Sequence, residues 1–258
     1  MDMTINKAFR KVPEITIVFW IVKLLTTAMG EATSDFLVFK INPYLAVAIG
    51  AIALTIALVI QFSARRYIPL VYWLTVAMVA VFGTMAADAL HIQLAIPYIV
   101  TTILFSVVLT IVFIVWHKTE KTLSIHSINT KRREIFYWLT VLATFALGTA
   151  AGDLTAITLG LGYFSSILLF IGLVAIPAIG YWLFKLNGIV AFWIAYILTR
   201  PIGASFADWM DRSKSSGGLA LGSGHVGIWL TIIIIVFVGY MTLNRKEIRR
   251  EQTVLKQL

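Results

Sequence analysis

Eight apolar stretches of about 20 residues, the length that a helix needs to cross a bilayer, constrain the fold of this chain more than any other feature. The composition agrees, because 60% of the 258 residues are hydrophobic and only 13% are charged. Soluble domains carry about 25% charged residues. We therefore expect an all-α polytopic membrane protein. The predicted spans are 15–37, 44–62, 70–90, 96–116, 135–154, 162–183, 189–207 and 226–243.

The basic residues predict the orientation of these spans. If both termini are cytoplasmic, most of the 21 lysine and arginine residues lie on the cytoplasmic side. Only Lys40, Arg212 and Lys214 fall on the outer side, while Lys23 and Arg200 lie within spans. This distribution follows the positive-inside rule. We attribute the net charge of +9 to topology and expect no nucleic-acid partner.

The first, third, fifth and seventh spans share one pattern, an aromatic residue and tryptophan followed by x9-Gly-x4-Asp. The aromatic-Trp pairs stand at 19–20, 72–73, 137–138 and 192–193, the glycines are Gly30, Gly83, Gly148 and Gly203, and the aspartates are Asp35, Asp88, Asp153 and Asp208. Four copies indicate internal duplication. Each unit holds two helices, so all copies have the same orientation. We expect four parallel two-helix repeats around a pseudo-symmetry axis along the membrane normal.

The chain is expected to form a single membrane domain over 1–258. The repeats cover about 13–66, 67–121, 131–186 and 187–245. A cytoplasmic loop at 117–134 and an outer loop at 209–224 are too short to form domains, and a basic cytoplasmic tail spans 244–258.

The aromatic-Trp and Gly-x4-Asp strings also carry a family resemblance over about 13–243. The chain resembles a bacterial membrane-protein family built of four tandem two-helix repeats, each marked by a tryptophan and catalogued as a repeat of unknown function. The resemblance implies the architecture and a bacterial inner-membrane location. It implies no substrate.

Two features of the motif have structural interpretations. The tryptophans are interpreted as anchors at the cytoplasmic membrane interface, where aromatic belts are common. Each glycine is followed four residues later by another small residue, Ser34, Ala87, Gly152 or Ala207. Such spacing lets helices approach closely, so we expect the four motif helices to form an inner ring.

The four aspartates have a functional interpretation. At one equivalent position on close-packed helices they converge, and converging like charges need protons, a cation or basic partners. Glu31 adds a fifth intramembrane acid, and Lys23 and Arg200 are the expected counter-ions. Two basic groups neutralise only two of five acids. We therefore predict that Asp35, Asp88, Asp153, Asp208 and Glu31 bind an ion or relay protons.

Other residues near the motif are possible accessories. Thr84 and Thr149 offer hydroxyl oxygens, and His91 follows Asp88 closely. Pro201 is expected to kink or open its helix, either to free carbonyls for a site or merely to adjust packing. The chain has no cysteine, and carboxylate and hydroxyl oxygens suit hard cations or protons. If the substrate is a metal, the same aspartates are the expected ligands.

The leading hypothesis is a secondary transporter, proton-coupled, that moves a metal ion or small cationic solute. No nucleophile or nucleotide-binding motif is present, so we expect neither an enzyme nor a cofactor. The expected partners are membrane lipid and the transported cation or protons. The alternatives are a cation channel with an Asp ring, an anion carrier that uses Lys23 and Arg200, and a membrane sensor or cofactor-binding protein. The oligomeric state is left open.

Overall fold

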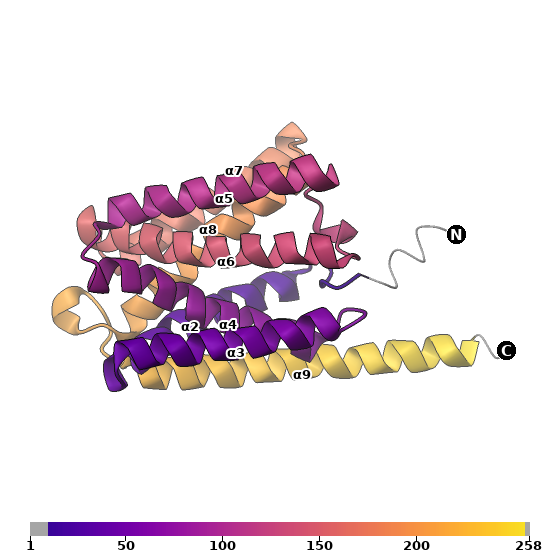
Figure 1. The fold of residues 1–258 in the computed structure, drawn as a ribbon, viewed down its shortest axis with the longest axis horizontal. Helices are drawn as coiled ribbons and strands as arrows, with labels where there is room; N and C mark the ends of the chain where they lie inside the picture. The colour runs from indigo at the N-terminus through magenta and orange to yellow at the C-terminus, as the bar shows by residue number, and fades with distance from the viewer. Residues whose placement is uncertain (1–9, 256–258) are drawn as a thin grey trace.

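The protein is a bundle of eight long helices, as seen in a computed structural model that describes residues 10–255 (Figure 1). The side chains at 92–93 and from 245 onwards, which include the predicted basic tail, lie outside the described part. All eight helices are long and apolar enough to span a membrane, which confirms the predicted class. In chain order they are α2 (Ile17–Lys40), α3 (Pro43–Ser63), α4 (Pro69–Asp88), α5 (Tyr98–Glu120), α6 (Lys131–Asp153), α7 (Tyr163–Phe184), α8 (Gly188–Asp211) and α9 (Ser223–Leu255).

Local signals set several helix starts. The side chains of Thr16, Asn42, Thr130 and Asn187 accept backbone N–H groups at the starts of α2, α3, α6 and α8. Short helical turns connect or extend the long helices. They are η1 (Ala89–Gln93) and η3 (Leu154–Thr158), both π-helical, and the 3-10 turns η2 (Ile125–Ser127) and η4 (Lys214–Ser216).

The four motif helices form the predicted inner ring. Helices α2, α4, α6 and α8 each pack against the next, and α8 closes the ring on α2. In the most apolar 18 residues of each, 56–67% are buried, against 17–28% for α3, α5, α7 and α9. The return helices therefore form an outer layer that leaves most of its surface for lipid.

The outer layer interlocks the repeats. Each return helix packs mainly on the motif helix of the following repeat, with α3 on α4, α5 on α6 and α7 on α8. The last return helix, α9, lies along α2 of the first repeat. The first and last long helices, α2 and α9, are thus in contact, and the four repeats close cyclically.

The motif glycines account for the close approach within the ring. A methyl group added at Gly30 would lie 2.3 Å from the Cβ of Ala80, and at Gly203 it would lie 2.4 Å from the Cγ2 of Thr27. Gly83 meets Phe145 and Gly148 meets Arg200 in the same way. Each glycine therefore contacts the residue three positions before the glycine of the next repeat, which confirms the pseudo-symmetry.

The expectation that the tryptophans anchor the membrane interface is wrong for three of the four. Trp73, Trp138 and Trp193 are buried, and only Trp20 is partly exposed. They pack with neighbouring aromatic rings at the end of the bundle where α2 begins, and Trp193 Nε1 donates to the Leu123 carbonyl at 2.9 Å. We call this the aromatic end, and the opposite end, where the motif aspartates lie, the acidic end. Packing within the ring explains the burial, because these side chains fill the space between neighbouring repeats.

Candidate functional site

Every fourth residue of each motif helix, in one register, belongs to a buried row, and residues of opposite helices meet, such as Thr149 with Glu31 and Arg200 with Thr84. We call these positions the axial stripes. They are Phe19, Lys23, Thr27, Glu31 and Asp35 on α2; Tyr72, Val76, Ala80, Thr84 and Asp88 on α4; Tyr137, Val141, Phe145, Thr149 and Asp153 on α6; and Phe192, Tyr196, Arg200, Ala204 and Asp208 on α8. All are buried except Asp88, which is partly exposed. Polar and charged groups thus meet in successive layers along the axis.

The middle layer is an ion pair bound by hydroxyls. Arg200 Nη2 lies 2.9 Å from Glu31 Oε2 and 2.7 Å from Thr149 Oγ1, and it also donates to Thr84 Oγ1. Both hydroxyls also donate to Glu31 Oε2, at 3.2 and 3.3 Å. Glu31, Thr84 and Thr149 occupy the same position in three repeats, and Arg200 reaches them from the fourth. We call this set the middle layer.

The rest of the Arg200 guanidinium is not hydrogen bonded within the described part of the chain. Its Nε and Nη1 are buried without a partner there, and the group lies 5.0 Å from the centre of the Phe145 ring. A cation over an aromatic face is partly stabilised by the ring electrons. Arg200 therefore uses Nη2 for all of its side-chain hydrogen bonds among the described residues, while the rest of its guanidinium group lies near the Phe145 ring.

Lys23 does not act as the predicted counter-ion. Its Nζ donates to Thr199 Oγ1 at 2.6 Å and lies 4.1 Å from the centre of the Tyr196 ring. Among the described residues no carboxylate forms an ion pair with it, although only 1% of the residue is exposed. It sits nearer the aromatic end than the acids do, because it precedes Glu31 by two helical turns.

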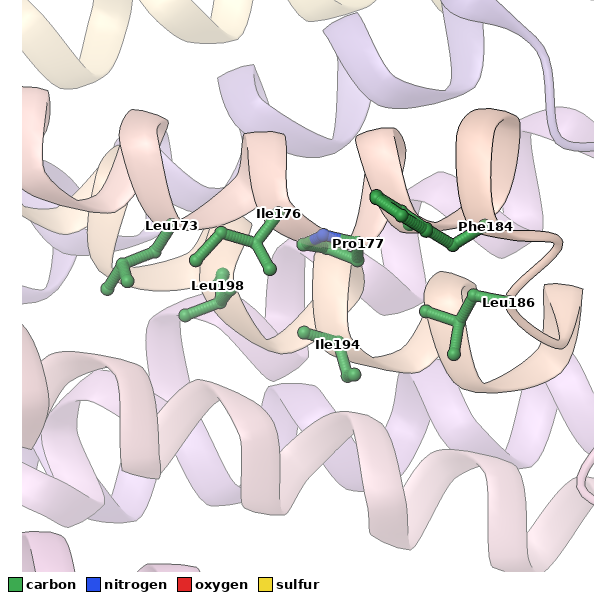
Figure 2. A pocket seen from close by; sticks show the side chains of 8 residues that line it. Leu173, Ile176, Pro177, Phe184, Leu186, Ile194 and Leu198 are labelled. Atoms are coloured by element: carbon green, nitrogen blue, oxygen red, sulfur yellow. The ribbon is translucent and has the colours of Figure 1, made fainter.

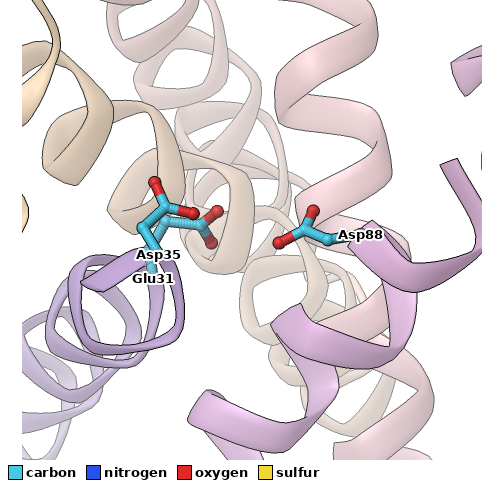
Figure 3. A group of neighbouring side chains, drawn as sticks. All are labelled: Glu31, Asp35 and Asp88. Carbon is cyan, nitrogen blue, oxygen red and sulfur yellow. The ribbon is translucent and has the colours of Figure 1, made fainter. Parts of the chain in front are cut away.

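Three acidic side chains meet where the middle layer adjoins the acidic end. Glu31 and Asp35 project from α2 and Asp88 projects from α4, with their carboxylates turned toward one another (Figure 3). One oxygen from each lies within 4.8 Å of the other two. Hard cations bind such oxygen sets, and protons equally neutralise them. We call Glu31, Asp35 and Asp88 the inner acidic trio.

A second acidic trio surrounds Arg212, which the predicted spans leave in the outer loop. Oxygens of Asp35, Asp208 and Asp211 lie within 4.8 Å of one another, and we call these residues the outer acidic trio. Arg212 Nη2 lies 2.7 Å from Asp35 Oδ2 and 2.9 Å from Asp208 Oδ1. Partial burial alone would lower the pKa of Arg212, but the carboxylates of Asp208, Asp35 and Asp211 outweigh it and hold that pKa well above its ordinary value.

The ion pair of Asp208 and Arg212 could have been predicted from the residue spacing, but the predicted span ended before both residues. Arg212 follows Asp208 by four residues, the spacing that places two side chains on one helix face. The predicted span ended at 207, whereas α8 continues to Asp211. The span prediction therefore left Asp211 and Arg212 outside the predicted site.

The remaining two aspartates have no basic partner within ion-pair distance in the described part of the chain. Asp153 is buried, and no basic side chain of the described residues forms an ion pair with it. Thus the acids of repeats 1 and 4 share Arg212, while those of repeats 2 and 3 do not. Asp88 and Asp153 are also the two that are followed at once by π-helical turns, η1 and η3. Such turns are frequent at functional sites.

Of the two alternatives left open for Pro201, the structure favours a role in packing over an opened helix. Helix α8 runs from Gly188 to Asp211 without interruption, with Pro201 buried inside it. The ring of Pro201 lies against Gly148 of the neighbouring helix, so the proline takes part in ring packing. The backbone irregularities lie instead in η1 and η3.

His91 is held locally. Its ring stacks on Tyr98, with centres 3.5 Å apart, and Nδ1 donates to the Ile96 carbonyl at 2.8 Å. This leaves Nε2 as the nitrogen with proton-relay capacity.

The apolar pocket in Figure 2 lies elsewhere. It is lined by α7 and α8 side chains such as Leu173, Ile176 and Leu198, and it offers a cation no ligand.

The comparisons with known proteins bear on the repeats. A model described as Repeat of Unknown Function (DUF347) matches residues 18–67, 71–122, 136–186 and 191–247. The chain belongs to this repeat family. The four matches in the DUF347 chain each cover one motif helix and its return helix, in agreement with the four-repeat prediction. No curated protein and no solved structure matches the chain.

Proposed function

We propose that the protein is a proton-coupled secondary transporter for a small cation, a metal ion or a cationic solute, with the inner acidic trio and Asp153 as its binding and relay groups. The convergence of Glu31, Asp35 and Asp88 carries this proposal. Asp208 belongs to the adjoining outer acidic trio, and Asp153 is buried at the equivalent position of α6. With Asp211, the acids outnumber the nearby basic groups. The acids are Glu31, Asp35, Asp88, Asp153, Asp208 and Asp211, and the basic groups are Lys23, Arg200 and Arg212. An uncompensated acidic cluster at membrane depth requires protons or a cation.

The packing of the axis supports a transporter over an open channel. The layer of Phe145 and Arg200 and the layer of Lys23 and Tyr196 fill the centre of the ring with large, fully buried side chains. An ion crossing the bundle would need these layers to rearrange. Carriers that alternate between two conformations meet that requirement, whereas a channel needs a continuous path.

Two observations favour the anion-carrier alternative. Arg200 Nε and Nη1 lack hydrogen-bond partners in the described residues, and Lys23 has no carboxylate partner there. Against it, Glu31 neutralises Arg200 at 2.9 Å. The axis as a whole remains acidic, so cations are the better-supported substrate.

The proposed setting is a bacterial inner membrane with both termini in the cytoplasm. The positive-inside rule supports this orientation, with the aromatic end inside and the acidic end outside. We propose no enzymatic activity, cofactor or nucleic-acid partner. The contacts expected beyond the substrate are with membrane lipid, and the oligomeric state is left open.

The first test is proton movement in proteoliposomes that hold a pH-sensitive dye. Vesicles are challenged in turn with Na⁺, K⁺, Mg²⁺, Mn²⁺, Ca²⁺ and small organic cations. We expect a saturable pH change with one cation class, and its loss in Asp153→Asn, which removes charge and preserves shape. Glu14→Gln is the matched control, because Glu14 precedes α2 near the aromatic end, outside the motif helices, and its side chain is 63% exposed. Unaltered flux in Asp153→Asn would contradict the proposed role of this residue.

A further inference from the structure

The Arg212 side chain occupies the outer acidic trio as a bound cation would. Its Nη2 contacts Asp35 Oδ2 at 2.7 Å, its Nε donates to Asp208 Oδ1 at 3.0 Å, and Nε lies 3.7 Å from Asp211 Oδ1. The three carboxylate side chains are only 9%, 3% and 4% exposed, whereas that of Arg212 is 32% exposed. The outer acidic trio thus forms a buried anionic cradle around the Arg212 side chain, which is itself partly exposed.

The cradle retains an unused acceptor. Asp211 Oδ1 is buried and accepts no hydrogen bond from any described residue, although it lies 3.7 Å from Arg212 Nε. Buried acceptors without a partner are costly and are uncommon in native proteins. A ligand with more N–H donors in reach than Arg212 provides would satisfy this oxygen.

The cradle also shares a residue with the proposed transport site. Asp35 belongs to both acidic trios and is the carboxylate nearest to Arg212 Nη2. An ion pair between Asp35 and Arg212 reduces the negative charge that a cation meets in the inner acidic trio. A cation in the inner acidic trio would therefore compete with Arg212 for Asp35.

Departure of Arg212 requires only its side chain to move. Its backbone is fixed by hydrogen bonds, because Arg212 N donates to the Asp208 carbonyl at 2.9 Å and Ala220 N donates to the Arg212 carbonyl at 2.8 Å. A change of side-chain rotamer moves the guanidinium outward while the loop stays in place.

We propose that Asp35, Asp208 and Asp211 form an entry site for guanidinium-type organic cations, which Arg212 occupies as a tethered competitor until an external cation displaces it. This inference rests on the proposed function and names its substrate class. Guanidinium compounds reproduce the Arg212 contacts, because their planar fork of N–H donors matches carboxylate oxygens. A free guanidinium ion also has the additional donors that Asp211 Oδ1 lacks.

The test measures cation binding by thermal unfolding of the detergent-purified protein in increasing methylguanidinium, below denaturing concentrations. If Arg212 fills the site about nine-tenths of the time, Arg212→Gln lowers the half-saturating concentration about tenfold. Lys214→Gln removes an equal charge from the same loop, and its half-saturating concentration is expected to equal that of the unmodified protein. Tetramethylammonium, which has no N–H donor, is expected to show no such shift.

Equal half-saturating concentrations in the unmodified protein and Arg212→Gln would overturn the inference, and so would an equal shift in Lys214→Gln or with tetramethylammonium. If Arg212→Gln does not fold, Arg212→Lys replaces it, since an ammonium makes fewer directed contacts and is displaced more easily. An unchanged value there would also overturn the inference. The proposed function fails separately, through absent Asp153-dependent flux, because the binding measurement does not depend on transport.

Discussion

The middle layer and the acidic end stand one helical turn apart on the same four helices, yet they treat charge in opposite ways. In the middle layer one carboxylate, Glu31, meets one guanidinium, Arg200, and two threonine hydroxyls complete the contacts. At the acidic end Asp35, Asp208 and Asp211 share Arg212, and Asp88 and Asp153 have no basic partner among the described residues. The first arrangement is balanced internally, while the second has an excess of negative charge.

The difference teaches that repeat symmetry alone does not make a site. The acidic end carries an aspartate at one equivalent position in all four repeats. The middle layer does not repeat in this way, because Arg200 stands one turn before the position that Glu31, Thr84 and Thr149 share. Divergence allowed the middle layer to neutralise itself. At the acidic end all four repeats carry aspartate, so no motif residue there can neutralise another. The negative charge is therefore balanced by Arg212, by protons or by a ligand. We infer that the middle layer stabilises the fold and is linked through Glu31 to the exchange site at the acidic end.

The largest expected effect comes from breaking the middle layer. Arg200→Met leaves the Glu31 carboxylate buried and unpaired, which destabilises the fold by about 3–5 kcal/mol. The double variant Glu31→Gln with Arg200→Met removes both charges and recovers most of this loss. Thermal unfolding in detergent measures the effect. A single variant as stable as the unmodified protein would show that the middle layer is not structural.

A smaller effect is expected from a methyl group added beside the middle layer. In Gly148→Ala the new Cβ would lie 2.1 Å from Arg200 Cγ and 2.6 Å from its Cβ, so Arg200 must shift. Overpacking of this kind costs about 1–3 kcal/mol.

Gly152→Ala is the matched control one turn along α6, where the nearest atom, Ser205 Oγ, is 3.5 Å away. We expect its melting temperature to stay near that of the unmodified protein. Equal losses in the two alanine variants would argue against close contact at Gly148.

The smallest effects are expected at the acidic end itself. Asp35→Asn removes the ion pair to the partly exposed Arg212 and lowers the free energy of unfolding by about 1 kcal/mol or less. Asp88→Asn removes a carboxylate that has no basic partner among the described residues, so it relieves repulsion and leaves the stability unchanged or slightly higher. Melting temperatures of the two variants, compared at one pH, test the difference. A larger loss in Asp88→Asn would indicate that this carboxylate has a stabilising partner.

Much of the fold followed from residue patterns. Run lengths predicted eight spans, and the spacing of Gly30 and its three counterparts predicted the inner ring, because both depend on local helix geometry. The same repetition predicted that the motif aspartates lie at one end, and the structure brings Asp35 and Asp88 together there.

The errors, and the alternatives left open at Pro201, have a common physical origin. The burial of Trp73, the position of Lys23 away from any described carboxylate and the uninterrupted helix at Pro201 all depend on which neighbour fills the adjacent space. Arg212 was missed because a helix end is set by capping and packing as well as by hydropathy. Such contacts join residues far apart in the chain.

The sequence by itself determined the membrane class, the four-fold duplication and the acidic position of each copy, since hydropathy, periodicity and spacing are properties of neighbouring residues. Only the tertiary structure decided how the charges are paired and how the repeats close, with α9 along α2 and Arg200 against Glu31. Pairing depends on distances of a few ångströms between segments more than 150 residues apart, because electrostatic and hydrogen-bond energies fall steeply with separation.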